Sequence, residues 1–471
     1  MVSTTSGECV GKKVSVDGVD VYRWLGIPYA ESTAGKNRFS KPRQITQKQR
    51  TMAQEPRLPC PQLVNGKVVG SEDCLHMNVW APKGRSGAGS NRTLVLASVS
   101  YWFQRGSNND PDWAELAAKG ISFVNSSIEV GRYAAHLFPH SHEIATAGVV
   151  VMSPNVRLGV LGFLHPNKST VKDVANEDAK AAMEWAVANA AAFGARPDGV
   201  VLVGRGSGAY MLTEAATSLN IRCSRAILEG PVPGALWPFN TGELEPTKDL
   251  ANATDCIDWG TRPLRCLRNS PLEVLLRKAA RLKFRFAPSL GDLRQFSKGP
   301  TLEIPEVIAG FDINQVRIFL DEYVRPPAVA TSYLSTAYHR WVFTINYFFP
   351  SYSYAHHKVK DHVAYPKTEN QLLTHLALYM GGCDTRSLVR KAAVKGFHYL
   401  TDGAEKQLFE PVLDMAAVVD FIKEGSVPIT EYGDPSEPWL SSGSTHMEFE
   451  DETDAPTQED VESCASHFLN K

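Results

Sequence analysis

The stretch with the clearest chemical potential lies where an apolar strand meets a glycine-rich turn. Residues 200–203, VVLV, have the length and β-branched character of a buried strand. The phrase Gly204-Arg205-Gly206-Ser207-Gly208 follows, ahead of a predicted helix. A sharp corner of this kind presents one side chain above the sheet edge, and in the pattern G-x-S-x-G that side chain is a nucleophilic serine. Here the central residue is Gly206, so the sequence predicts a corner without its nucleophile.

Ser207 is the hydroxyl nearest to that corner. It stands one position after the centre, where a serine at a helix start is the ordinary interpretation, and we expect its side chain to point along the helix. The alternative is a displaced nucleophile at Ser207 or Ser100, which would leave the chain with weak hydrolytic activity.

Several histidines could act as a base or bind a metal. His356, His357 and His362 lie in the phrase HHKVKDH, which a solvated surface explains better than a metal site. The histidines of residues 136–142 have the same interpretation, and His398 is a further candidate base. We therefore predict no metal and no cofactor.

Alternating strands and helices must position these residues. The segment Lys13–Tyr22 alternates apolar and polar residues around Asp17-Gly18, which predicts an N-terminal β-hairpin. The alternation favours an α/β fold, with a mostly parallel, doubly wound sheet flanked by helices. We find no repeat or linker and expect a single domain over residues 1–471. Strands are predicted at 76–80, 93–99, 148–152, 200–203 and 225–228, and a helix at 177–193.

Several phrases in the first half of the chain carry a family resemblance. They are GIPYAE, SEDCLHMNVWAP, NVRLGVLGFL and NEDAKAAMEWAVANAAAFGARPDGVVLVG, in that order. Together they resemble the cholinesterase/type-B carboxylesterase family, and the resemblance implies an α/β-hydrolase fold. Scaffold positions of the family are filled here by Asn155, Arg157, Gly159, Asp178, Trp185 and Trp237.

The resemblance implies that each part of the family's catalytic machinery is altered. Its nucleophilic serine aligns with Gly206, and its acidic residue with Gln315. The best register places Asp414 near the catalytic histidine. The family's H-G-G-G-F phrase, whose amides bind the oxyanion, aligns with Val99-Ser100-Tyr101-Trp102-Phe103. Tyr101 and Trp102 then replace glycines, so we expect a filled or distorted oxyanion site.

The resemblance also implies three disulfides. The expected pairs are Cys60 with Cys74, Cys256 with Cys266, and Cys383 with Cys464. Cys9 and Cys223 are left as unpaired thiols. Such a framework favours an oxidising compartment. Glycosylation sequons, which are weaker indicators, occur at Asn91, Asn125, Asn167 and Asn252.

Composition limits the partners. The net charge of -2 gives no basis for binding nucleic acid, and no apolar run approaches the roughly 20 residues of a membrane span. The start lacks the apolar core of a signal peptide, which fits either a cytosolic chain or a mature secreted one. Two charged segments could contact partners, although solvated surface is the ordinary interpretation: the basic residues 277–286 and the acidic residues 448–462.

These observations predict a secreted or extracellular pseudoenzyme that binds a protein partner, as adhesion proteins such as the neuroligins do in the same family. A carrier of a hydrophobic small molecule in the remnant gorge is a second hypothesis, and the weak ester hydrolase is a third. A homodimer is possible by resemblance.

Overall fold

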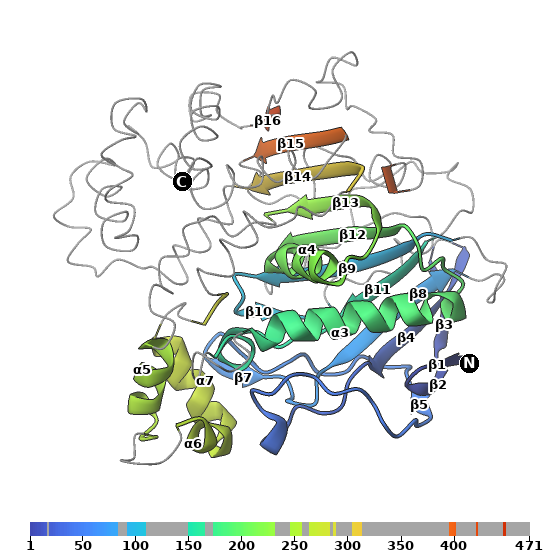
Figure 1. The fold of residues 1–471 in the computed structure, drawn as a ribbon. Helices are drawn as coiled ribbons and strands as arrows, with labels where there is room; N and C mark the ends of the chain where they lie inside the picture. The colour runs from blue at the N-terminus through green and yellow to red at the C-terminus, as the bar shows by residue number, and fades with distance from the viewer. Residues whose placement is uncertain are drawn as a thin grey trace, which may run out of the picture.

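The structure is a computed structural model that describes residues 1–16, 18–82, 92–109, 149–164, 173–230, 245–256, 263–282, 286–288, 304–312, 395–401, 421–422 and 446–448. Its main feature is an 11-stranded sheet (Figure 1). One side of that sheet is parallel, in the order β16 (His446–Glu448), β15 (Lys395–Thr401), β14 (Glu306–Asp312), β13 (Cys223–Glu229), β12 (Val200–Gly206), β9 (Leu94–Tyr101) and β11 (Val150–Pro154).

The other side of the sheet is antiparallel. It continues from β11 through β8 (His76–Pro82), β4 (Val19–Pro28) and β3 (Lys12–Val16), while the short β10 (Arg105–Gly106) pairs with β9. Strands β3 and β4 form the predicted hairpin, with Lys12 opposite Arg23. The predicted α/β architecture is confirmed, and it includes this antiparallel N-terminal side.

Two helices cover one face of the sheet. They are α3 (Val174–Asn189) and α4 (Ser207–Leu219), which lie side by side in Figure 1. Helix α3 buries four alanines at helical spacing, at positions 175, 179, 182 and 186, so much of its buried face consists of small side chains. It continues into η2 (Ala190–Phe193), which ends at Gly194 in the left-handed conformation that favours glycine after a helix. All four residues 200–203 of β12 have 0% exposure, as a strand covered on both faces requires.

The remaining elements are short. Strands β1 (Val2–Thr4), β2 (Gly7–Val10) and β5 (Thr51–Met52) form a three-stranded sheet, and β6 (Gln62–Val64) pairs with β7 (Lys67–Val69). The short helices are η1 (Gly35–Asn37), α2 (Gly159–Gly162), α5 (Glu245–Ala253), α6 (Pro263–Asn269) and α7 (Leu272–Arg281), and the last three gather at one end of the molecule (Figure 1).

Two of the three predicted disulfides are present. Cys60 is bonded to Cys74, and Cys256 to Cys266. The third predicted pair, Cys383 and Cys464, lies outside the described residues. Cys9 and Cys223 are buried free thiols, and burial raises the pKa of Cys223 to about 12. This thiol is therefore protonated and unreactive at neutral pH.

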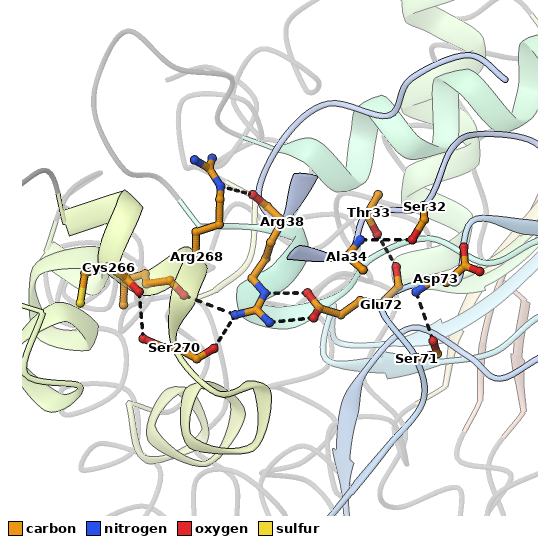
Figure 2. Close-up of polar contacts among 11 residues, drawn as sticks. Ser32, Thr33, Ala34, Arg38, Ser71, Glu72, Asp73, Cys266, Arg268 and Ser270 are labelled. Atoms are coloured by element: carbon orange, nitrogen blue, oxygen red, sulfur yellow. Dashed lines mark hydrogen bonds and ion pairs between the residues drawn. The ribbon is translucent and has the colours of Figure 1, made fainter. Parts of the chain in front are cut away.

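The side chain of Arg38 joins the loop closed by the Cys60–Cys74 disulfide to the end of α6, the helix that contains Cys266 (Figure 2). Its Nε and Nη2 atoms donate to the two oxygens of Glu72 at 2.6 and 2.7 Å, and Glu72 lies within the 60–74 loop. Its Nη1 atom donates to the carbonyl oxygen of Ser270 at 2.6 Å, just after α6. Arg268 in turn donates to the carbonyl oxygen of Arg38 at 2.9 Å. The guanidinium of Arg38 thus binds a backbone carbonyl at the end of α6. Together the two arginines fix α6 against the N-terminal region.

His76 begins β8 in a buried position. Its side chain is 4% exposed, and no described residue forms a hydrogen bond with its Nδ1 atom. Its backbone carbonyl accepts hydrogen bonds from the Asn155 amide and the Asn108 side chain. Burial therefore disfavours a charge on this imidazole, and the nearby carboxylate of Asp73 offsets that cost only in part.

Acidification is expected to destabilise the protein through His76. Burial lowers the pKa of His76, with Asp73 raising it and Arg57 lowering it further. Below about pH 6.5 the unfolded chain therefore binds more protons at this site than the folded chain. The stability contribution is complete above that pH and is lost as the pH falls toward the folded-state pKa. Urea unfolding at about pH 7.5 and 5.5 should show a smaller acid loss in His76→Gln than in the wild type; equal losses would contradict this prediction.

Candidate functional site

The corner between β12 and α4 has the geometry of a sharp strand-to-helix turn. Gly206 lies at its centre with φ 58° and ψ -135°, a conformation that side-chain-bearing residues adopt only under strain. Gly208 allows the new helix to approach β9, because a Cβ atom there would lie 2.6 Å from the carbonyl oxygen of Ser98. The glycines of the phrase GRGSG therefore serve the turn and the close packing of α4.

Ser207 is the first residue of α4, as expected, but it does not cap the helix. The side chain is 4% exposed and contacts the end of β9 instead. Its Oγ atom lies 2.8 Å from the Oγ of Ser100, and it accepts a hydrogen bond from the backbone N–H of Phe103 at 2.9 Å. These contacts hold the hydroxyl between the sheet and the β9–β10 turn.

The turn from β9 to β10 carries aromatic residues in an unusual backbone conformation. Trp102 and Phe103 have φ values of 49° and 62°, which are uncommon without glycine. Packing holds Phe103 in place: it is 1% exposed and makes edge-to-face contacts with Phe163 and Tyr210 at centroid distances of 5.3 and 5.5 Å.

Hydrogen bonds fix the same turn from outside. The carbonyl oxygen of Phe103 accepts from the amide of Gly159 at 2.6 Å. Gln104 donates from Nε2 to the carbonyl oxygen of Phe286 at 2.8 Å. Tyr101 ends β9 and pairs with Arg105. Packing and hydrogen bonds therefore hold the backbone of this turn and the side chains of Phe103 and Gln104 in place.

A buried ion pair lies directly before the corner. Arg205 pairs with Val99 on one side and Glu229 on the other, where neighbouring parallel strands end. The Nε atom of Arg205 lies 2.6 Å from Oε1 of Glu229, and the two side chains are 10% and 4% exposed. Each charge is matched by the other, so the polar groups beneath the corner are engaged with one another.

Other predicted site residues fall outside this constellation. His398 lies within β15, opposite Ala309 on β14. In the described part of the chain, no group of three or more His, Cys, Asp or Glu residues is arranged to hold a metal ion. Outside the described residues lie Gln315, Asp414, His356, His357, His362, Asn91, Asn125 and Asn167.

One participant, Glu229, was missed from the sequence alone. Glu229 directly follows a predicted strand, as Ser100, which was among the predicted site residues, follows another, so both belong at the edge where parallel strands terminate together. The position of a polar residue directly after a predicted parallel strand was the signal that could have identified Glu229. The register that places Gly206 opposite Ser100, and Arg205 opposite Glu229, was not available without the strand order.

None of the helices within the described ranges has the length and apolar character to cross a bilayer. The model of the carboxylesterase family matches residues 1–301. The cholinesterase of Mus musculus is 27% identical over 329 residues, which cover 64% of this chain and 48% of that protein. The acetylcholinesterase of Danio rerio is 30% identical, covering 61% of this chain and 46% of the relative.

A relative described as a secreted lipase, from Arthroderma benhamiae, is 28% identical and covers 57% of this chain and 47% of its own length. The chain thus spans about half the length of the curated relatives it matches. The family match covers the hairpin, the β12–α4 corner and both described disulfides, and the α/β-hydrolase fold of that family agrees with the sheet seen here. The chain belongs to the carboxylesterase family.

Proposed function

We propose that this chain is a non-catalytic carboxylesterase relative that acts outside the cell by binding a protein partner. The observation that carries the proposal is Gly206 at the centre of the elbow, at the φ and ψ of the turn that should present a nucleophile. Without a side chain at that position, no oxygen can attack an ester carbonyl from the elbow.

The neighbouring hydroxyl does not replace the missing nucleophile. A serine nucleophile needs a hydrogen-bonded base that can take its proton. The hydroxyl of Ser207 instead contacts another hydroxyl, Ser100, and accepts the N–H of Phe103. Its burial also keeps it from a bulky substrate. These contacts favour a structural role for Ser207.

The proposed location and partner rest on other features. The disulfides at Cys60–Cys74 and Cys256–Cys266 persist in oxidising compartments. The similarity to a secreted lipase supports the same location. The net charge of -2 disfavours nucleic acid, and we propose a protein as the partner class.

Ester hydrolysis by the purified chain is expected to equal the rate without protein. Hydrolysis of short-chain and long-chain p-nitrophenyl esters should be unchanged in Ser207→Ala and Ser100→Ala, because neither hydroxyl acts as a nucleophile. Steady-state rates of the three proteins, with near-UV circular dichroism as a folding control, provide the measurement. Turnover by the wild type that disappears in Ser207→Ala would overturn the proposal.

The binding part of the proposal has its own test. The labelled chain should bind saturably to intact cells from its source, and unlabelled chain should compete. Protease treatment of the cell surface should remove the binding. Its absence from all cell types tested would contradict the proposed surface partner, and protease-resistant binding would contradict its being a protein.

A further inference from the structure

Helix α5 presents one face to the protein and the opposite face to solvent. Thr247, Leu250 and Ala251 are buried at the spacing of one helical face. Lys248 and Asn252, four residues apart, are exposed on the outer face. The Asn252 side chain is therefore accessible in the folded protein.

The backbone around Asn252 is fixed by the end of α5. The amide of Cys256 donates to the carbonyl oxygen of Ala251 at 2.8 Å, and the amide of Asp255 donates to that of Asn252 at 3.2 Å. Asp255 has φ 55°, the left-handed residue that closes such a helix end. The disulfide from Cys256 to Cys266 follows immediately. Asn252 thus lies on the exposed side of a helix end that hydrogen bonds and the nearby Cys256–Cys266 disulfide hold in place.

Asn252, Ala253 and Thr254 form an N-x-T sequon, the acceptor pattern for N-linked glycans. Thr254 is the required hydroxyl residue, and in the fold its Oγ1 donates to the carbonyl oxygen of Leu250 at 2.7 Å. We infer that Asn252 carries an N-linked glycan, an inference that rests on the extracellular location proposed above. Of the four sequons, this one lies in the described part of the chain.

The modification is a group transfer from a lipid-diphosphate-linked oligosaccharide in the secretory pathway. A bond forms between Nδ2 of Asn252 and the anomeric carbon of the sugar, while the bond from that carbon to the diphosphate oxygen breaks. The amide loses one proton to a base of the transferase, and the lipid diphosphate leaves. The product covers the outer face of α5 with a bulky polar group, so the proposed protein partner binds elsewhere.

The test is secretion of the full chain, behind a signal peptide, from eukaryotic cells. Site-specific mass spectrometry should find Asn252 glycosylated in the wild type and converted to aspartate by an amidase that removes N-glycans. Asn252→Gln should lose one glycan without losing folding, because the side chain is exposed. Thr254→Ser is the matched control: it keeps the sequon and the hydroxyl and should keep the glycan, whereas Thr254→Val should lose it.

Two outcomes separate this inference from the proposed location. An unmodified Asn252 in secreted, disulfide-bonded protein would overturn the inference, whatever the other sequons carry. A glycosylated Asn252 in that protein would support it, and finding the native protein inside cells without glycans would then overturn the extracellular proposal instead.

Discussion

Replacing Gly206 with serine is expected to give no esterase activity and to lower the free energy of unfolding by about 1–3 kcal/mol. The elbow conformation, φ 58° and ψ -135°, is one that glycine adopts without steric cost and serine does not. A family member that uses a serine here must tolerate this strain in order to present the nucleophile. This chain has glycine at the strained position, where glycine avoids that steric cost and presents no side chain.

The absence of activity in Gly206→Ser follows from the surroundings of the elbow. Loss of a nucleophile or base costs about 10⁶-fold in turnover, and oxyanion donors add about 10²–10³-fold where the triad works. The turn that should supply donors carries Trp102 and Phe103, and the amide of Phe103 is bonded to Ser207. A serine introduced at position 206 would therefore lie beside a turn in which the amide of Phe103 is already hydrogen-bonded to Ser207.

Gly206→Ala separates the two effects. It introduces the same backbone strain without a hydroxyl, so its urea-unfolding midpoint should fall as far as that of Gly206→Ser. Strong ester turnover in Gly206→Ser alone would contradict the proposed loss of the whole machinery. Unchanged stability in both variants would contradict the strain at the elbow.

The substitution Asp178→Asn is expected to destabilise the protein by about 3–5 kcal/mol. Asp178 accepts from Nε and Nη2 of Arg157 at 2.8 and 2.6 Å, and also from the backbone amide of Arg157 at 3.1 Å. The side chain of Arg157 is 3% exposed and that of Asp178 is 0% exposed. Removing the carboxylate leaves a guanidinium charge buried without a counter-charge, which costs more than the pair itself contributes.

An exposed ion pair provides the control for that experiment. On α7, the Nη2 atom of Arg277 lies 2.9 Å from Oε1 of Glu273, four residues earlier. The side chain of Arg277 is 48% exposed and that of Glu273 is 63% exposed. Water and salt screen such a pair, so Glu273→Gln should change the stability by at most about 0.5 kcal/mol. Urea unfolding of both variants in the same buffer is the measurement. Equal, small losses would show that the buried pair is not a major support of the α3 region.

Local patterns were enough to predict much of the fold. The alternation around Gly18 predicted the β3–β4 hairpin, and the VVLV run predicted the fully buried first four residues of β12. The pairs Cys60–Cys74 and Cys256–Cys266 followed from family resemblance. These features depend on residues close together in the sequence or on well-matched phrases. They could therefore be predicted without knowing the order of the strands.

The contacts within the candidate site could not be predicted in the same way. The approach of Ser207 to Ser100 spans 107 residues of sequence and depends on β12 lying beside β9 in one register. The left-handed conformation of Trp102 is imposed by tertiary packing around the turn, against its intrinsic preference. The Arg205–Glu229 ion pair also depends on the order of the strands, because β12 must lie beside β13. The glycine-rich phrase alone did not indicate this pair.

The most direct measurement of the central claim is covalent labelling of the folded wild-type chain by a fluorophosphonate, read by intact-protein mass spectrometry. This reagent reacts with serines that a base has activated. We predict that the mass of the chain will not change. An active serine hydrolase in the same tube, as the control, should be fully labelled. A stoichiometric adduct mapped to Ser207 or Ser100 would contradict the assignment of this carboxylesterase relative as non-catalytic.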